Sequence, residues 1–300
     1  MLPIYYSDIF PMVLPEDHPF PKDKYALLRG RIGAHWADRV RMEVPPPASD
    51  EDILRAHSSD YLQRFVSGDL SPREIRRAGL PWSKPIVKRT RYAVGATIAA
   101  CRAALAQGVA VNLGGGTHHA FPDRGQGFCW LNDTVIAART MQAEKRTRTV
   151  LVVDCDVHQG DGVAAMTSDD PTIFTFSIHG RNNFPFRKQI SDLDIPLDDG
   201  TGDSAYLDAL ESGLDKVMQR FSADLVVYLA GADPYEMDRW GRMALSKKGL
   251  ATRDRRVIGR FTRAGLPVAI TMAGGYAPDV QDIVDIHFGT IETAIEAISQ

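Results

Sequence analysis

The sequence predicts an α/β protein built on a mostly parallel sheet. Two observations support this class. From about residue 108 onward, short apolar runs alternate with longer helical patterns, and the runs are continuously apolar rather than alternating with polar residues. Strands covered by helices on both faces have this composition, and each intervening helix can provide the crossover that parallel pairing requires. With 300 residues, 44% of them hydrophobic, and no linker or repeat, a single domain over residues 1–300 is expected.

The elements follow in order along the chain. The first hundred residues are predicted to be mostly helical, with the clearest helix from Ser83 to Gln107, where Ala and branched residues recur at helical spacing. The Pro-rich stretch 44–49 predicts a turn. The expected strands are 109–115, 149–155, 172–179, 223–231 and 266–275. The expected helices lie near 130–143, 203–221, 246–264 and 279–298.

Four of the five predicted strands run directly into glycines or polar side chains. The segments concerned are Gly114–His119, Asp154–His158, Gly231–Asp233 and Gly274–Tyr276. In open α/β sheets, ligands bind beyond the carboxyl ends of the strands. The sequence therefore predicts that these segments form a site together.

The segment that begins at Asp154 has the composition of a metal site. Residues two apart in an extended chain point to the same side, so Asp154, Asp156 and His158 can share one face. Groups of this kind are costly to bury alone and become acceptable around a cation. Asp156 and His158, together with Asp233 from another strand end, give three ligands and leave a fourth position open. This arrangement is typical of catalytic zinc, and the same ligands also bind Fe²⁺.

Two carboxylates of this segment remain as partners for the adjacent His118 and His119. Asp154 and Asp161 can each accept a hydrogen bond from one imidazole, which fixes its tautomer and raises its basicity. One histidine could then be a general base and the other an electrostatic partner. Tyr276 could donate to a developing oxyanion.

Plainer interpretations of these residues stay open. Asp161 could instead cap a helix that starts at Gly162. Phe128 and Trp130 are expected to start a helix after Gly125 and Gly127, and could belong to the core or to a pocket wall.

Composition excludes several classes of protein. A net charge of −3 argues against a nucleic-acid-binding body. No apolar run approaches the length of a membrane span, and the N-terminus lacks the pattern of a secretory signal, so a cytoplasmic protein is expected. The three cysteines, Cys101, Cys129 and Cys155, form no CxxC pair, which fits a reducing compartment.

With these residues in view, the chain resembles the histone deacetylase family over nearly its whole length. The matching motifs are Gly115–His119, Gly127–Cys129, Asp154–Gly162, Ala230–Asp233 and Gly274–Tyr276. The stretches HPFPKDKY, DVHQGDG and AGADPYEMDRWGRMALSKKGL look most like class IV histone deacetylases and bacterial histone deacetylase-like proteins. The resemblance implies the arginase/deacetylase fold, which is a three-layer α/β/α arrangement with eight mostly parallel strands. It also implies zinc-dependent hydrolysis of N-acyl-lysine, with long-chain acyl groups within the expected range.

The resemblance also implies a role for each matching residue. Asp156, His158 and Asp233 would hold zinc, His119 with Asp161 would be the general base, and His118 would pair with Asp154. Tyr276 would polarise the acyl carbonyl. A structural K⁺ would be bound by Asp154, Asp156, His158, Ser177 and Ile178. The substrate-binding residues would be Gly127, Phe128, Phe184, Gly274 and Gly275, where the alignment leaves Phe186 as an alternative to Phe184.

The chain departs from the family pattern at two places. Residues 79–83 contain no acidic residue where other classes place an aspartate that grips the substrate backbone. Gly241–Leu245, which includes Arg242, replaces the more usual Gly-Gly-Leu. The first departure puts peptide recognition in question.

Three alternative functions remain, and the oligomeric state is not predicted. Small acylated amines such as acetylpolyamines would be favoured by a carboxylate at the tunnel mouth, from Asp17, Glu16 or Glu236. An arginase-like ureohydrolase with two metals is disfavoured, because Gly231 stands two residues before Asp233, where a further carboxylate would be needed. A non-enzymatic metal-binding protein would not need both histidines, their carboxylates and the tyrosine.

Overall fold

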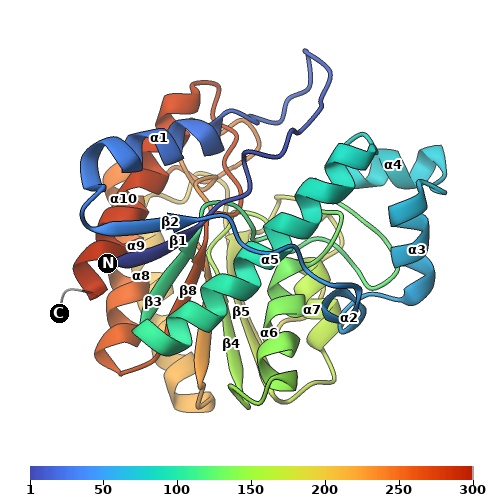
Figure 1. Cartoon of the computed structure of the whole chain (residues 1–300). Helices are drawn as coiled ribbons and strands as arrows, with labels where there is room; N and C mark the ends of the chain where they lie inside the picture. Colours follow the sequence, from blue (N-terminus) through green and yellow to red (C-terminus); the bar gives the residue numbers. More distant parts are fainter. Residues whose placement is uncertain (299–300) are drawn as a thin grey trace.

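A computed structural model describes residues 1–298 and contains an eight-stranded sheet between two layers of helices (Figure 1). The strand order is β2-β1-β3-β8-β7-β4-β5-β6, and every neighbouring pair is parallel. The strands are β1 (Leu2–Tyr5), β2 (Val40–Glu43), β3 (Val109–Asn112), β4 (Val150–Asp154), β5 (Ile173–Gly180), β6 (Leu193–Leu197), β7 (Leu225–Leu229) and β8 (Val268–Thr271). The predicted three-layer α/β/α class with a parallel eight-stranded sheet is confirmed.

The helices divide between the two faces of the sheet. One face is covered by α1 (Lys24–Trp36), α8 (Asp203–Arg220), α9 (Lys247–Arg263) and α10 (Val280–Ile298). The other face is covered by α5 (Lys84–Gln107), α6 (Asp133–Ala143) and α7 (Asp161–Thr167), and the short helices α2 (Asp50–Leu54), α3 (Ser59–Ser67) and α4 (Pro72–Ala78) join that layer. Within residues 1–298, no helix combines the length and the apolar character that crossing a bilayer requires.

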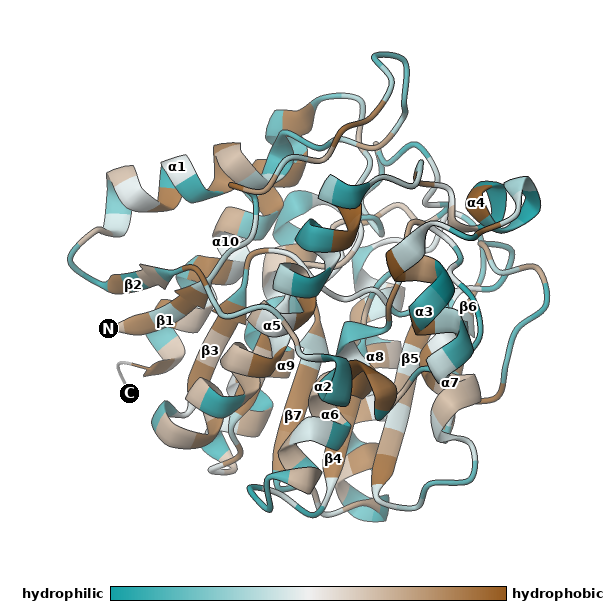
Figure 2. Cartoon of the chain, turned by 45° about the vertical axis from the view of Figure 1, so that its right-hand side comes forward, coloured by the Kyte–Doolittle hydropathy of each residue, from teal (hydrophilic) through white to brown (hydrophobic). Residues whose placement is uncertain are grey.

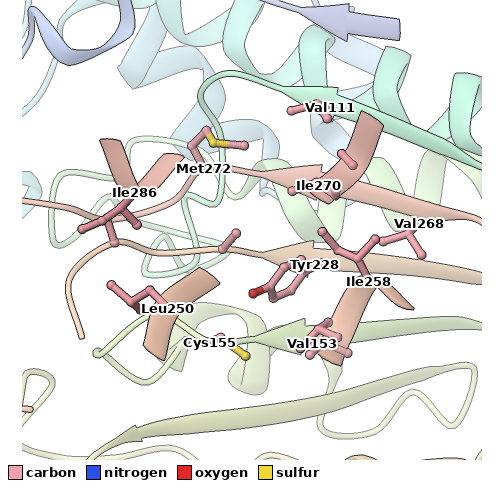
Figure 3. Close-up of a cluster of buried hydrophobic side chains, with 14 of the residues drawn as sticks. Val111, Val153, Cys155, Tyr228, Leu250, Ile258, Val268, Ile270, Met272 and Ile286 are labelled. Atoms are coloured by element: carbon pink, nitrogen blue, oxygen red, sulfur yellow. The ribbon is translucent and has the colours of Figure 1, made fainter. Parts of the chain in front are cut away.

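Side chains alternate along each central strand between two apolar clusters, one on each face of the sheet. On β4, Leu151 and Val153 join the cluster under α8–α10, while Val150 and Val152 join the one under α5 and α6. All four are at most 1% exposed, and each such burial stabilises the fold by about 1.5–3 kcal/mol relative to exposure. The central strands are accordingly coloured as hydrophobic in Figure 2. In Figure 3, side chains from four neighbouring strands, including Val153, lie among residues of the covering helices.

The five predicted strands and the helices between them are confirmed, but three strands were missed. β1 and β2 lie in the region predicted to be mostly helical, and β6 was not predicted. β2 and β6 are the edge strands, and their partly exposed residues do not form a continuous apolar run. β1 has only four residues, of which one is proline. Short strands of this kind are identified by their neighbours in the sheet and not by their own composition.

The helix expected near residue 130 begins later than predicted. It starts at Asp133, where the side chain of Asn132 accepts a hydrogen bond from the backbone N–H of Val135. Phe128 has a positive φ of 64° and therefore precedes the helix instead of starting it. Trp130 is 2% exposed and belongs to the core, Phe128 is partly buried against the same cluster, and both side chains line a cavity. The helix predicted from Ser83 to Gln107 is confirmed as α5, and Ser83 is its N-cap.

Candidate active site

Four segments that follow β3, β4, β7 and β8 meet at one edge of the sheet. These four strands lie side by side at its centre, in the order β3-β8-β7-β4. Because all of them are parallel, their carboxyl ends open at the same edge, and the segments that follow them come together. The predicted convergence of these segments is therefore confirmed, although they are separated by up to about 160 residues along the chain.

Asp156, His158 and Asp233 form a compact buried cluster whose potential ligand atoms all lie within 4.8 Å of one another. His158 Nδ1 is 2.9 Å from Asp156 Oδ1 and 3.3 Å from Asp233 Oδ2. Ligands bound at about 2.1 Å in a tetrahedral site are about 3.4 Å apart, so these spacings suit one cation. Asp233 Oδ2 is buried and has no hydrogen-bond partner among residues 1–298. An oxygen of this kind is what a metal ion would satisfy, and these residues fit one.

Backbone groups hold the two carboxylates of this cluster in place. Gly274 N–H donates to Asp156 Oδ2 at 2.8 Å, and Val157 N–H donates to Asp233 Oδ1 at 2.9 Å. A side chain at Gly274 would collide with both carboxylates, so glycine is required there for steric reasons. Gly274 also lines a cavity.

Charge within the cluster explains the protonation of its members when no cation is bound. Burial and the negative charge of Asp156 raise the pKa of Asp233 to about 7. Burial opposes a charge on His158, but the two carboxylates outweigh it and raise the pKa of this histidine to about 10. A bound cation would displace these protons.

The adjacent histidines each face the carboxylate that the family resemblance implied. His118 Nδ1 is 2.7 Å from Asp154 Oδ2, and His119 Nδ1 is 2.7 Å from Asp161 Oδ1. All four residues are at most 4% exposed. The capping alternative for Asp161 is wrong. Helix α7 begins at Asp161 itself, its N-cap is Gly160, and no side chain caps it.

The two histidines have opposite pKa shifts. Burial and the charge of His118 lower the pKa of His119 to about 4. Burial also opposes a charge on His118, but Asp154 and Asp156 outweigh it and raise the pKa of His118 to about 9. When no cation is bound, these shifts favour neutral His119 and protonated His118 at neutral pH. Two titratable groups whose environments separate their pKa values are typical of an acid–base site.

Aromatic side chains form the wall around His119. The Phe184 ring lies 4.9 Å from the His119 ring, in edge-to-face geometry, whereas Phe186 is 84% exposed. The structure thus places Phe184 and not Phe186 against the histidines. Gly127 has a φ of 55°, and an added Cβ there would lie 2.7 Å from the His119 ring. Glycine at this position allows the chain to pass directly over the histidine.

Two cavities meet at these residues. An outer cavity of about 500 Å³ opens between Phe184, Phe128 and Trp240. An inner cavity of about 100 Å³ continues behind the histidines toward Tyr25 and Leu80. The residues that line both are His119, Gly127, Phe128, His158 and Tyr276. An extended substrate could therefore enter from the outer cavity and place a small group in the inner one.

Tyr276 lies at the junction of these cavities and is held by residues that the sequence did not indicate. Its backbone N–H donates to Asp238 Oδ2 at 2.6 Å, and the preceding carbonyl of Gly275 accepts from Lys24 Nζ at 3.1 Å. Lys24 is 2% exposed, and burial lowers its pKa to about 8. Burial together with Asp156 raises the pKa of the Tyr276 phenol well above its usual range, so the phenol remains a hydrogen-bond donor.

The site is also supported by two buried side chains, Asp133 and Arg253, which the sequence did not indicate. Asp133 accepts hydrogen bonds from the backbone N–H groups of Gly116 and Thr117, at 3.0 and 2.7 Å, and so fixes the segment that carries the two histidines. Arg253 donates to the carbonyls of Gly231 and Cys155, at 2.6 and 3.3 Å, and these residues lie close to the Asp-His-Asp cluster in the sequence. Nothing in the local sequence shows that these side chains are buried.

The residues expected at the potassium site also lie together. Asp154 and Ser177 are partners in the register of β4 and β5. The backbone N–H of Gly180 donates to the carbonyl of Val157 at 2.9 Å, which holds the segment of Asp156 and His158 against the end of β5. Ile178 is the residue after Ser177 on the same strand.

Comparison with known proteins agrees with this geometry. A family model described as "Histone deacetylase domain" matches residues 18–291. The chain belongs to the histone deacetylase family, and this membership supports an amide hydrolase of the deacetylase type.

Individual relatives include proteins of bacteria and plants. An uncharacterized protein of Picosynechococcus sp. is 43% identical over 286 residues, which cover 95% of each chain. Histone deacetylase 2 of Arabidopsis thaliana is 29% identical over 91% of this chain and 74% of its own. Acetoin utilization protein AcuC of Bacillus subtilis is 32% identical over 74% of this chain and 63% of its own. Among solved structures, the HDA15 HD domain superposes with a TM-score of 0.80 at 17% identity, covering 100% of this chain and 94% of the other, which shows the shared fold.

Proposed function

We propose that the protein, as a single catalytic domain, hydrolyses N-acyl-lysine with the help of one Zn²⁺ held by Asp156, His158 and Asp233. One observation carries this proposal: a buried Asp-His-Asp cluster lies beside two histidine–carboxylate pairs, at the junction of an outer and an inner cavity. When bound, the ion would supply Lewis acidity, which polarises an acyl carbonyl and lowers the pKa of water. Fe²⁺ suits the same ligands.

His119 would move the protons in this reaction. Its Nδ1–H donates to Asp161, which leaves Nε2 as a proton acceptor on the neutral ring. Nε2 would take a proton from the water that attacks the acyl carbonyl, and would return it to the leaving amine. The C–N bond then breaks, and the products are a carboxylate and a free lysine amine.

His118 and Tyr276 would stabilise the charge that develops during this reaction. When protonated, His118 would place a positive charge beside the Asp-His-Asp cluster, with its Nε2 3.8 Å from Asp156 Oδ1. The phenol of Tyr276 would donate to the oxyanion of the tetrahedral intermediate. The methylene groups of the substrate lysine would lie between Phe128 and Phe184, and Gly127 would pass beside them. K⁺ held by Asp154, Ser177 and the carbonyls of Asp156, His158 and Ile178 would stabilise the segment that carries the ligands.

The other candidate functions find less support. The buried Asp-His-Asp group is the single cluster of its kind among residues 1–298, and Gly231 offers no ligand for a second metal. No carboxylate from Asp17, Glu16 or Glu236 lines the outer cavity, so the acidic gate that would favour an acetylpolyamine is missing from the part of the chain that the structure describes.

Hydrolysis of a fluorogenic acyl-lysine amide tests the proposal. We expect turnover by the purified protein, loss of turnover after chelation, and recovery when Zn²⁺ is added back. Turnover that persists in the chelated protein would contradict the role of the metal. An acyl series from acetyl to myristoyl, on lysine and polyamine scaffolds, then measures the preferred chain length and amine. The class IV resemblance extends the expected range to long chains, and strict preference for acetyl would contradict that extension.

A further inference from the structure

An arginine lies beside or within each of the two segments that depart from the family pattern, and both arginines are at the outer cavity. The segment without an acidic residue, 79–83, begins two residues after Arg77, and Arg242 lies in the segment that replaces Gly-Gly-Leu. Both arginines line the outer cavity, and no carboxylate lines it among residues 1–298. The mechanism above uses neither arginine.

The backbone holds Arg77 at this entrance. Arg77 lies near the end of α4, and its carbonyl accepts a hydrogen bond from the N–H of Gly127 at 3.2 Å. The next carbonyl, that of Ala78, accepts from the N–H of Phe128 at 2.7 Å. The end of α4 is therefore fixed against Gly127 and Phe128 in the wall of the outer cavity. Arg77 is exposed, and no carboxylate within residues 1–298 forms an ion pair with it.

Arg242 is held on the other side of the entrance by a buried amide. Asn183 is 3% exposed, and its side chain donates to the carbonyl of Trp240 at 2.6 Å and accepts from the N–H of Arg242 at 3.3 Å. The guanidinium of Arg242 lies 3.3 Å from Asp199, and both side chains are exposed. A pair exposed to solvent is worth little energy and leaves the arginine free to change partner.

The segments around the entrance carry an excess of positive charge. Residues 73–77, 181–188 and 236–242 contain eight Arg or Lys residues and three Asp or Glu residues, whereas the whole chain has a net charge of −3. One of the three acidic residues, Asp238, is occupied by backbone N–H groups. Asp198 and Asp199 form exposed ion pairs with Arg181 and Arg242, which leaves an excess of three positive charges in the segments around the opening that leads to His119.

We propose that this entrance selects an acyl-lysine carried by an acidic peptide segment. The inference rests on the proposed function and adds the charge of the substrate to it. A positive entrance attracts an anionic chain and raises its association rate, while it repels chains of its own sign. Acylated polyamines keep at least one ammonium group, and lysine-rich tails keep several, so both would be poor substrates.

A set of acyl-lysine peptides with Glu, Gln or Lys at the two positions on each side tests this proposal. We expect kcat/KM to fall in the order Glu, Gln, Lys, with a difference on the order of 10-fold between the first and the last at low salt. At about 0.5 M salt the difference should largely disappear, because charges in solvent are screened over a few ångströms. N-acetylated polyamines should be cleaved more slowly than the Gln peptide.

Variants assign the preference to the two arginines. Arg77→Glu/Arg242→Glu should reverse the order, and Arg77→Gln/Arg242→Gln should abolish it. The control Lys216→Glu/Arg255→Glu makes the same change in net charge at exposed positions on α8 and α9, outside the lining of the outer cavity, and should keep the wild-type order.

The outcomes separate this proposal from the proposed function. Three outcomes would overturn the selection by charge and leave the deacylase function standing. The protein could hydrolyse all peptides without a preference for Glu, or it could prefer the Lys peptides. The control variant could also lose the preference for Glu that the wild type shows. Failure to hydrolyse any acyl-lysine peptide in the presence of Zn²⁺ would overturn the proposed function and this inference with it.

Discussion

Arg253 is among the largest fully buried side chains of residues 1–298, and its removal should be strongly destabilising. Its guanidinium forms an ion pair with Asp254 at 2.8 Å and donates to the carbonyls of Gly231 and Cys155. Asp254 also accepts from the hydroxyl of Tyr228 at 2.6 Å. Replacement of Arg253 by methionine would keep much of the volume but would leave a buried carboxylate without its cation and two carbonyls without their donor.

The size of this effect follows from the number of groups left without a partner. Breaking a buried ion pair by removing one member costs about 3–5 kcal/mol. For a chain of 300 residues, the entropy of unfolding near the midpoint is about 0.6 kcal/mol/K. We therefore expect Tm to fall by about 5–8 °C in Arg253→Met. The carbonyls that lose their donor belong to residues next to Asp156 and Asp233 or two positions away, so the affinity for the proposed Zn²⁺ should fall as well.

Thermal unfolding followed by circular dichroism measures the change, and a second variant tests its cause. Arg253→Met/Asp254→Asn removes both charges and keeps an amide for the hydroxyl partners, so it should be more stable than Arg253→Met alone. A decrease in Tm of less than about 2 °C for the single variant would refute the estimate of 3–5 kcal/mol. A double variant that is less stable than the single one would refute its assignment to an unpaired charge.

Three further predictions concern the chemistry and its dependence on pH. Tyr276→Phe should lower kcat by about 10²–10³-fold with zinc content unchanged, and near-normal turnover would remove the tyrosine from the mechanism. Asp161→Asn should lower kcat by at least about 10²-fold, because an amide no longer holds His119 in the reactive tautomer; full activity in that variant would show that the carboxylate has no role in the reaction. Zinc binding should release protons and tighten from pH 5 to 8, because the metal-free cluster holds protons on Asp233, whose pKa is raised to about 7, and on His158. Calorimetry in two buffers of different ionisation enthalpy measures the number of protons released. If no protons are released at pH 6, this cluster is not the binding site.

The last prediction concerns stability in acid. Hydrogen bonds from Ser71, together with Arg64, lower the pKa of Glu74 from 4.5 to about 2. A carboxyl whose pKa is lowered by folding stabilises the protein above its unfolded pKa, and this contribution is lost as the pH falls toward the folded value. Wild type should therefore be more stable than Glu74→Gln at pH 7, and the difference should shrink between pH 4.5 and 2. A difference that is constant over this range would contradict the assignment.

Much of the site could be predicted because its key groups are close in the sequence. Asp154, Asp156 and His158 follow one another at the end of a buried strand, and alternation along an extended chain is enough to place them together. The apolar runs of β4, β5 and β7 are equally local, because strands buried on both faces need apolar residues at every position. Edge strands such as β6 lack this signal.

Other features depend on distant parts of the chain. Asp161 could have been a helix cap or a partner of His119, and the choice depended on whether a segment 42 residues away came within reach of it. Lys24 and Arg253 have no local mark of burial, because their environment is provided by Tyr276 and by the ends of β4 and β7.

By itself, the sequence determined which chemical groups the site contains, since ligand types and their spacing within one strand end are local properties. Only the tertiary structure decided which distant residues complete the site. The strand order β3-β8-β7-β4 brings Asp233 and Tyr276 to the two histidines, and the packing of three separate segments places Arg77 and Arg242 at a shared entrance. The physical reason is that charge, burial and reach between distant residues are set by which strands pair, and parallel pairing is a property of the whole sheet.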